Sequence, residues 1–334
     1  MLLVLFLAVS SHYNIYKMTL SIVYFLVGIV LVIKGAGFLT RGASALARRF
    51  NISELVIGLT IVALGTSLPE LVISVGSAIK GNSGIALGNI VGSNIFNGMF
   101  ILGVAALITP VKFNPRMLTR ELPFNLLASV VLLLLSGSML VGGAAGEFIS
   151  RYDGMIMLCF LAVFIRYTFS IPSDGEPDEK GETMGFGKIT LFVAAGLAML
   201  IFGGNIFVNG ASGIARMLGM SEAVIGLTIV SAGSSLPELA VSVNAARKGN
   251  VGIALGNVLG SNILNIFLIL GCSATISPIS LDGFSFVDNY VLLASSLLLY
   301  IVARFGGKST ITRFEGGLLV ALYVAYTTYL VINA

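Results

Sequence analysis

The chain has 334 residues, of which 57% are hydrophobic and only 10% are charged, and its mean hydropathy is +1.01. Because a soluble domain carries about 25% charged residues, this composition excludes an ordinary soluble protein and predicts a polytopic membrane protein. The net charge of +4 comes from basic residues scattered between apolar segments, so it gives no reason to expect a nucleic-acid partner. The two cysteines lie in apolar runs and are too few for a disulfide framework.

Residues 1–17 precede the first segment that is long enough to cross a bilayer. The apolar run at 2–9 is short, whereas a membrane helix needs about 20 apolar residues. No basic residue precedes this run, which argues against an ordinary signal peptide. We expect an N-terminal extension over 1–17, explained either by an interfacial anchor or by a translation start placed too far upstream.

Ten apolar segments of spanning length follow along the chain. Two of them exceed one untilted crossing of about 20 residues, so we expect broken or strongly tilted helices there. A stretch rich in Asp, Glu, Gly and Pro separates the fifth segment from the sixth and is typical of a solvated cytoplasmic linker, 173–187. The segments lie near 19–36, 42–79, 85–110, 119–140, 153–172, 188–209, 211–246, 253–276, 286–304 and 314–332.

The sequence at 42–97 recurs at 210–265 with 37 identities in 56 aligned positions and no gap. Five spans therefore fall in each half, 18–172 and 188–334. Because five is odd, the second half enters the membrane from the opposite side, and the repeats are predicted to be inverted. Inverted repeats with broken helices place a transport site near the bilayer midplane.

The basic residues predict the orientation of the chain. With the N-terminus outside, 15 of the 19 Lys and Arg residues fall on the inner side, as the positive-inside rule requires. Both termini are then extracellular, in a multi-pass protein of the cell membrane. The four exceptions are Lys17, Lys80, Arg151 and Arg216.

The most informative stretch is GTSLPE at 65–70, which returns as GSSLPE at 233–238. Each copy places an acid, Glu70 or Glu238, one residue after a helix-breaking proline inside a long apolar segment. An acid at the bilayer centre costs about 3 kcal/mol or more, so such residues usually mark function. The alternative is a buried acid that only fixes helix packing.

Oxygen donors surround both acids in the sequence. The prolines open the helix, which we expect to free backbone oxygens around Ala63 and its repeat equivalent Ser231. Hydroxyls at i−4 and i−3 share the face of each carboxylate. Hard oxygen donors of this kind suit Ca²⁺, and Na⁺ can share them, whereas a chain with one His and no His or Cys in these motifs is a poor zinc or copper site. The hydroxyl residues are Thr66, Ser67, Ser234 and Ser235; Ser67 and Ser235 have back-bonding to the helix as their alternative.

The next segment of each repeat adds amides. It reads GNIVGSNIFN at 88–97 and GNVLGSNILN at 256–265, with glycines every four residues that permit close helix approach. Ser93 and Asn97 lie on one helical face, as Ser261 and Asn265 do. The asparagines are either ligands or interhelical hydrogen-bonding groups, and the further candidates are Asn89, Asn94, Asn257 and Asn262.

These paired motifs resemble the two alpha-repeats of the sodium/calcium exchanger branch of the calcium/cation antiporter superfamily. The resemblance covers essentially everything after Met18 and implies an all-α membrane protein with ten transmembrane helices in two inverted five-helix repeats. It implies that Glu70 and Glu238 are the central calcium carboxylates. It also implies that Thr66, Ser67, Ser93, Ser234, Ser235 and Ser261 line the sodium and calcium sites, and that Asn97 and Asn265 complete the ring.

One position departs from the pattern of some members. Where the potassium-dependent exchangers have an Asp, this chain has Asn265, which argues against potassium co-transport and leaves two acids at the centre. We therefore expect a secondary-active antiporter, not an enzyme, that exports Ca²⁺ in exchange for Na⁺ by alternating access. It would need no cofactor and would work in membrane lipid as a monomer.

The remaining classes fit less well. A Ca²⁺/H⁺ antiporter is the alternative, although proton coupling leans on extra acids or His where this chain has Ser93 and Asn97. A channel needs a continuous pore, and an intramembrane serine protease needs a Ser–His pair, while His12 precedes the first span. Glu54 and Glu222 each follow a Ser and are expected to be helix-start residues with a structural role.

Overall fold

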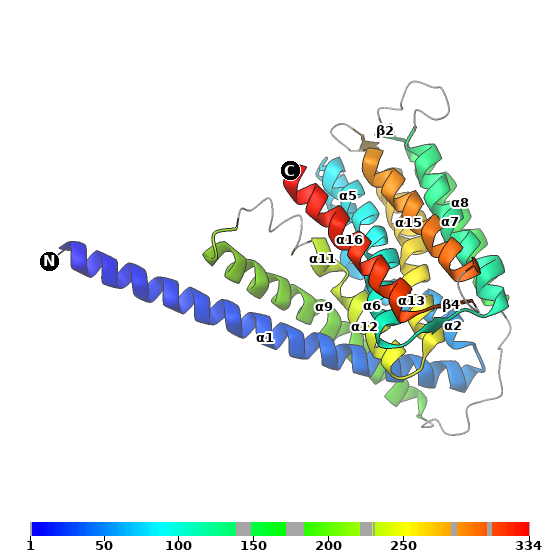
Figure 1. The fold of residues 1–334 in the computed structure, drawn as a ribbon, viewed down its shortest axis with the longest axis horizontal. Helices are drawn as coiled ribbons and strands as arrows, with labels where there is room; N and C mark the ends of the chain where they lie inside the picture. Colours follow the sequence, from blue (N-terminus) through cyan, green and yellow to red (C-terminus); the bar gives the residue numbers. More distant parts are fainter. Residues whose placement is uncertain are drawn as a thin grey trace.

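The computed structural model is an almost entirely helical bundle and describes residues 2–137, 148–171, 184–220, 229, 231–281, 286–305 and 309–333, with side chains undescribed at 2–15, 231, 286 and 333. Its first half contains α1 (Leu2–Phe50), α2 (Glu54–Ile57), α3 (Ala63–Thr66), α4 (Leu68–Ile79), α5 (Ser83–Ile95), α6 (Leu102–Ile108), α7 (Leu122–Leu135) and α8 (Arg151–Phe169). Its second half contains α9 (Phe186–Met217), α11 (Ser231–Ser234), α12 (Leu236–Arg247), α13 (Val251–Leu264), α14 (Gly271–Ile276), α15 (Phe286–Phe305) and α16 (Arg313–Asn333). Figure 1 shows α1 running far beyond the bundle at its N-terminal end.

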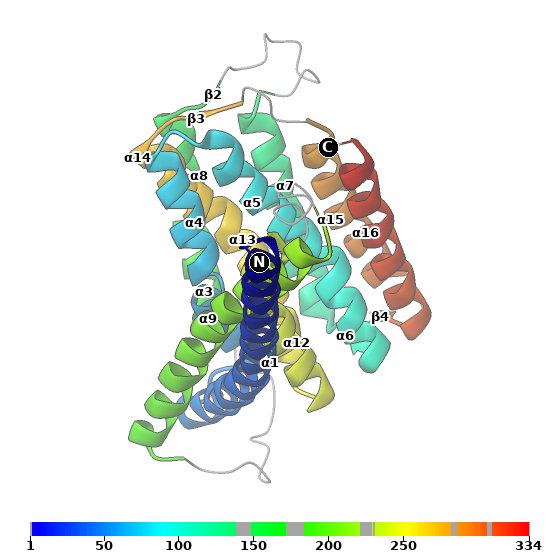
Figure 2. The ribbon, with the colours of Figure 1, turned by 90° about the vertical axis from the view of Figure 1, so that its left-hand side faces the viewer.

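Two very long helices, α1 and α9, pack against each other along glycine stripes. Gly28 meets the backbone of Phe207, and Gly196 meets that of Leu39, so the helices run antiparallel. Adding 168 to Gly28 gives Gly196, and subtracting 168 from Phe207 gives Leu39, so the second contact is the first with the two helices exchanged. Without Cβ atoms these glycines let the two backbones approach closely, which is how membrane helices gain packing energy. Figure 2 shows the two helices crossing on one side of the bundle.

The motif helices form the centre of the bundle. In the most apolar 18-residue window of Val251–Ile276, 94% of the residues are buried, against 11% in that of Arg313–Ile332. The glycine ladder of α13 explains its close packing, because Gly252, Gly256 and Gly260 contact the backbone or Cβ atoms of the segment Glu54–Ala63. The predicted ladder therefore works as expected in the second repeat. The equivalent partners of the first ladder lie mostly in 221–230, largely outside the described residues.

Within the described ranges, π-helical segments interrupt the α-helices at η1 (Gly58–Val62), η2 (Phe96–Ile101), η3 (Met117–Glu121) and η6 (Asn265–Leu270). Such wide turns add a residue to the helix and often occur at functional sites. Asn97 lies in η2, and Asn265 opens η6. The sequence did not indicate these segments, because a π-turn changes the helical period only locally.

The sequence predicted the broken helix correctly but placed the helices beside it wrongly. Helices Glu54–Thr66 and Leu68–Ile79 meet at an angle of 50°. However, the first helix does not end near residue 36, since α1 continues to Phe50, and α9 likewise passes residue 209 and ends at Met217. Gly35, Gly42 and their counterparts in α9 are contact points inside helices and do not end them. The extension 1–17 is continuous with this first helix.

Eight helices in the described part of the chain are long and apolar enough to cross a membrane, or nine with the bent pair counted as one span. The expected segment 211–246 falls partly on residues 221–228 and 230, outside the described residues, as do most of the expected linker 173–187 and Glu222. Short strands in the described ranges, which the expected all-α fold did not include, join the halves: β1 (Val111–Lys112) pairs with β4 (Thr310–Ile311), and β2 (Phe148–Ile149) pairs with β3 (Ile279–Ser280).

Candidate cation site

The two Pro-Glu turns meet in the interior of the bundle. Pro69 and Pro237 each lie in the first turn of a new helix, α4 or α12, where a missing backbone N–H costs little. Ser67 and Ser235 each lie two residues before the proline, where one helical segment ends and the next begins. Each turn therefore holds a carboxylate at the beginning of a helix, directly after a break.

Each carboxylate is held by a serine of the other repeat. The Ser235 hydroxyl donates to Glu70 Oε1 at 2.9 Å, and the Ser67 hydroxyl donates to Glu238 Oε1 at 3.0 Å. Both acids are only 1% exposed. The two turns thus interlock across the centre of the bundle.

The following helix of each repeat supplies a second hydroxyl. Ser93 on α5 donates to Glu70 Oε1 at 3.4 Å, and Ser261 on α13 donates to Glu238 Oε1 at 3.5 Å. Ser67 also donates to Ser261 at 3.0 Å. Each carboxylate therefore lies in a buried cluster with two predicted serines, one from the opposite Pro-Glu turn and one from the next helix of its own repeat.

The second oxygens of both carboxylates, Glu70 Oε2 and Glu238 Oε2, are buried without a hydrogen-bond partner among the described residues. A buried ionised oxygen without a partner carries a large desolvation cost. A bound cation would remove that cost by supplying the missing positive charge. Unpartnered amide oxygens lie on the same motif helices, at Asn97, Asn262 and Asn265.

The asparagines divide into those with interhelical hydrogen bonds and one, Asn97, without any among the described residues. Asn265 donates to Asn94 Oδ1 at 2.9 Å, and Asn94 donates to the Asn262 carbonyl at 3.1 Å, so these three join the two motif helices. Neither polar atom of the Asn97 side chain has a hydrogen-bond partner among the described residues, although that side chain is only 1% exposed. Asn97 is thus the candidate amide with a free oxygen and no packing bond.

The hydroxyls of Thr66 and Ser234 also contact asparagines of the opposite repeat. The Thr66 hydroxyl lies 3.0 Å from Asn257 Oδ1, and the Ser234 hydroxyl lies 3.4 Å from Asn89 Oδ1. Asn257 in turn donates to Ser242 at 2.9 Å. These bonds orient the amides behind the cluster.

One expected oxygen keeps its ordinary partners. The Ala63 carbonyl accepts from the Ser67 amide at 3.0 Å and from the Thr66 hydroxyl at 3.3 Å, so the expectation that it loses its partners is wrong. The reason is that the helix continues to Thr66 and breaks only at Ser67. Ser231 opens α11, but its side chain is outside the described residues.

Three polar groups of the interior were not singled out in the sequence. Ser74 and Ser242 accept hydrogen bonds from Asn89 and Asn257, both at 2.9 Å. Their signal was their place four residues after Glu70 and Glu238, on the same helical face. Glu121 is fully buried, accepts from the Tyr167 hydroxyl at 2.5 Å and lies 4.0 Å from Arg116. Its signal was an acid inside a predicted span.

The sequence expectation for Glu54 is met in part. Its helix start is capped by the Ser53 hydroxyl, which accepts from the Val56 amide. The Glu54 carboxylate accepts from Ser44 on α1 at 2.9 Å. The residue therefore has a packing contact as well as its place in the first turn of a helix.

The described parts of the chain contain no group of three or more His, Cys, Asp and Glu side chains suited to a metal. The interior site instead offers two carboxylates together with hydroxyl and amide oxygens, which are the hard donors preferred by Ca²⁺ and Na⁺ and not by zinc or copper. Fold and interior together define a multi-pass membrane protein with a buried cluster of carboxylate, hydroxyl and amide oxygens.

The chain belongs to the sodium/calcium exchanger family, since the family profile described as "Sodium/calcium exchanger protein" matches residues 20–170 and 188–332. It is 37% identical to the sodium/calcium exchanger MaX1 of Methanosarcina acetivorans, over 93% of this chain and 99% of that protein. It is 35% identical to the putative antiporter CaxA of Alkalimonas amylolytica, over 92% and 98%.

Solved structures show the same fold. The sodium-calcium exchanger NCX_Mj, soaked with zero Na⁺ and Ca²⁺, superimposes with a TM-score of 0.79 at 33% identity, covering 94% of this chain and 99% of that one. The predicted family is thereby confirmed. The family is one of membrane transporters that exchange cations, and its members are not enzymes.

Proposed function

We propose that the protein exports Ca²⁺ in exchange for Na⁺ at a site formed by Glu70, Glu238 and their serine partners. The observation that carries this proposal is the pair of buried carboxylates, each bound through one oxygen to the other repeat and each left with an unpartnered Oε2. One Ca²⁺ neutralises two carboxylates. Several Na⁺ ions do the same with help from hydroxyl and amide oxygens, and the two sets of ions compete for the same donors.

Competition becomes exchange because the empty site is costly. Without a cation, two carboxylates remain in an environment of low dielectric, and an uncompensated buried charge costs several kcal/mol. The empty protein is thus expected to change its open side only reluctantly, while either loaded form crosses that barrier more easily. Alternating access follows when the helices that carry the site rearrange around it.

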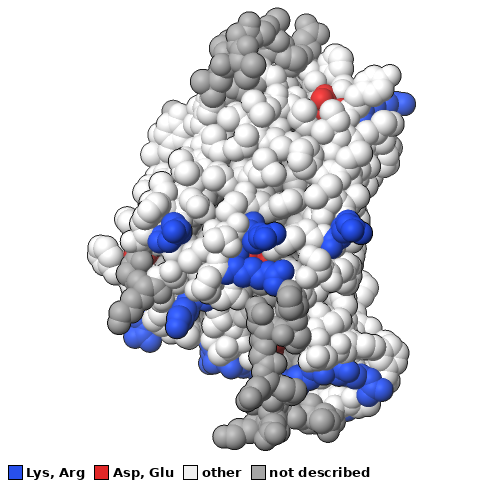
Figure 3. All heavy atoms as spheres, turned by 90° about the vertical axis from the view of Figure 1, so that its right-hand side faces the viewer, with Lys and Arg blue, Asp and Glu red and all other residues white. Residues whose placement is uncertain are grey.

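We infer from the repeat that the five-helix halves are inverted and that the site lies near the bilayer midplane. The contacts between α1 and α9 support the inversion. The pair Gly28 and Phe207 becomes the pair Gly196 and Leu39 when 168 is added to the first position and subtracted from the second. On the face in Figure 3, Lys and Arg gather towards one end of the molecule. By the positive-inside rule this end is cytoplasmic and both termini are extracellular. We take the exchanger to work as a monomer.

Ion flux in vesicles tests the proposal. Purified protein is reconstituted into liposomes loaded with Na⁺, and ⁴⁵Ca²⁺ uptake is measured with the sodium, proton and potassium gradients set separately. We expect uptake to follow the outward sodium gradient and to be unaffected by potassium. Uptake that follows a pH gradient and ignores sodium would contradict the proposal and establish the Ca²⁺/H⁺ alternative.

A further inference from the structure

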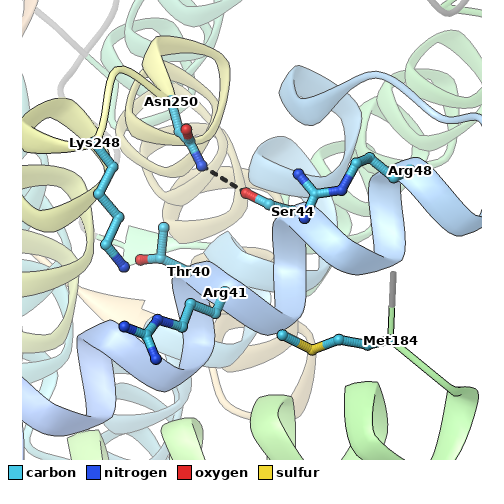
Figure 4. A pocket seen from close by; sticks show the side chains of 7 residues that line it. All are labelled: Thr40, Arg41, Ser44, Arg48, Met184, Lys248 and Asn250. Atoms are coloured by element: carbon cyan, nitrogen blue, oxygen red, sulfur yellow. Dashed lines mark hydrogen bonds between the residues drawn. The ribbon is translucent and has the colours of Figure 1, made fainter. Parts of the chain in front are cut away.

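A polar pocket of about 370 Å³ lies between the C-terminal part of α1 and the loop after α12. Its volume falls within the range of about 300–1,000 Å³ that is usual for small-ligand sites. Figure 4 shows Lys248 and Arg41 around Thr40 at one end of the pocket and Arg48 beyond Ser44 at the other. None of these residues belongs to the carboxylate cluster. The polar lining residues are Thr40, Arg41, Ser44, Arg48, Lys248 and Asn250.

Three cations line this pocket, and no acid is found among the lining residues that the structure describes. Burial, together with the nearby Arg41, lowers the pKa of Lys248 below the ordinary value for lysine. The ion pair seen in the described parts of the chain joins Arg116 to Glu121, and neither residue lines this pocket. Glu54, which does not line the pocket, accepts a hydrogen bond from the lining residue Ser44. The pocket thus concentrates positive charge that its own described walls do not balance.

The pocket also holds a donor without an acceptor. Arg48 Nε is buried and has no hydrogen-bond partner among the described residues. Ser44 is already used, since it donates to Glu54 and accepts from Asn250 Nδ2 at 2.6 Å. An unpartnered buried donor costs about 1–3 kcal/mol, and an oxyanion is the ligand that would satisfy it.

We propose that this pocket binds a phosphate group, supplied by the head group of an anionic phospholipid. Arginine forks match phosphate oxygens geometrically, and lysine adds a point charge. The pocket lies at the end of a membrane helix, where clusters of basic side chains meet lipid head groups, and basic pockets between membrane helices bind such groups. A phosphate held there joins α1 to the loop that follows α12, the helix of Glu238.

Lipid binding to the full-length protein in neutral detergent, followed by native mass spectrometry, tests this assignment. The probes are phosphatidylglycerol and phosphatidic acid, with phosphatidylcholine of the same acyl chains for comparison. Glycerol phosphate and inorganic phosphate, added as competitors, distinguish a lipid ligand from a free one. We expect saturable binding of the two anionic lipids that phosphatidylcholine does not match.

The variants separate the pocket from general charge. R41Q/R48Q/K248Q is expected to weaken binding of phosphatidylglycerol by at least about tenfold. The control K80Q/R151Q/R216Q removes the same charge at other helix ends and should bind nearly as wild type. If the first variant fails to fold, single variants at the exposed Arg41 and Lys248 serve, each with an expected loss of about threefold.

Three results would overturn the assignment. The first is equal loss in both triple variants, which indicates diffuse electrostatic attraction. The second is undiminished lipid binding when the pocket charges are removed. The third is binding that appears only after the acids at 174–182 are neutralised, because the chain's own carboxylates would then be the pocket's anion.

Displacement of lipid by millimolar inorganic phosphate would support the phosphate site with a free ion as its ligand. The measurement does not depend on ion exchange, so a failure here leaves the proposed transport function standing.

Discussion

The two copies of the motif build nearly the same cluster from different chain segments. In the first repeat, Glu70 receives one hydroxyl from Ser235 and one from Ser93; in the second, Glu238 receives one from Ser67 and one from Ser261. Each serine before a proline therefore serves the opposite carboxylate. This exchange teaches that neither repeat forms a complete site alone, since half of each carboxylate's support comes from the other.

The copies differ in two hydrogen bonds. Ser67 also donates to Ser261 at 3.0 Å, and Asn265 donates to Asn94 at 2.9 Å, whereas the equivalent Asn97 has no partner among the described residues. The second repeat is thus more tightly bonded around its acid than the first. The following variants either remove the shared part of the site or measure this difference.

Replacement of either acid by glutamine removes the shared part. Glu70→Gln and Glu238→Gln each leave one buried carboxylate to balance a divalent ion, and breaking a buried charge pair costs about 3–5 kcal/mol. We expect sodium-driven ⁴⁵Ca²⁺ uptake to fall by more than about 100-fold in both variants. Glu315→Gln, which changes a partly exposed helix-start acid by the same charge, is the control and should retain uptake. Near-normal uptake in either site variant would refute the two-carboxylate mechanism.

The serines before the prolines measure the asymmetry. Ser67→Ala removes donation to Glu238 and to Ser261, whereas Ser235→Ala removes donation to Glu70. A hydrogen bond to a charged group contributes about 1.5–3 kcal/mol. We expect the apparent Ca²⁺ affinity to fall roughly tenfold in both, with the larger loss in Ser67→Ala. Ca²⁺ dependence of the initial uptake rate gives the comparison, and a larger loss in Ser235→Ala would reverse it.

The glycine contacts between α1 and α9 test the symmetry outside the site. A Cβ at Gly35 would lie 2.9 Å from the Gly196 carbonyl oxygen, and one at its mate Gly203 would lie 2.6 Å from the Leu31 Cβ. Overpacking of this kind costs about 1–3 kcal/mol. Gly35→Ala and Gly203→Ala should lower the apparent melting temperature in detergent by similar amounts. Gly37→Ala, which meets no atom within 4 Å, should not; equal effects at all three glycines would contradict this account.

Much of the site could be predicted because its chemistry is local in sequence. The Pro-Glu turns, their neighbouring serines and the Ser and Asn of the next helix are all carried by short repeated motifs, and the structure brings Glu70, Ser93, Ser235 and their counterparts together. What could not be predicted depends on distant partners. Whether a glycine ends a helix or lets two helices touch, as Gly35 does, depends on what faces it.

The same limit explains the missed acid and the interior serines. Glu121 lies in the interior because Tyr167, which is distant in sequence, reaches its carboxylate. Ser74 and Ser242 are polar residues within apolar helices, and only the asparagines of the next helix give them a partner. The expectation of a freed oxygen at Ala63 was wrong for a local reason, since the helix continues to Thr66 and breaks only at Ser67.

The smallest expected effect separates the ligand role of an asparagine from its packing role. Asn265→Ala leaves Asn94 Oδ1 without its donor, which costs about 1 kcal/mol, so it should lower the apparent melting temperature by about 2–4 °C. Asn97→Ala removes no hydrogen bond among the described residues, so it should leave that temperature unchanged in the absence of ions. If the free amide oxygen of Asn97 binds a transported ion, this variant should instead shrink the stabilisation that saturating Ca²⁺ or Na⁺ gives. Thermal unfolding with and without each ion measures both effects. A variant of Asn97 that lowers the ion-free temperature and keeps its full ion-induced shift would make this residue a packing group like Asn265.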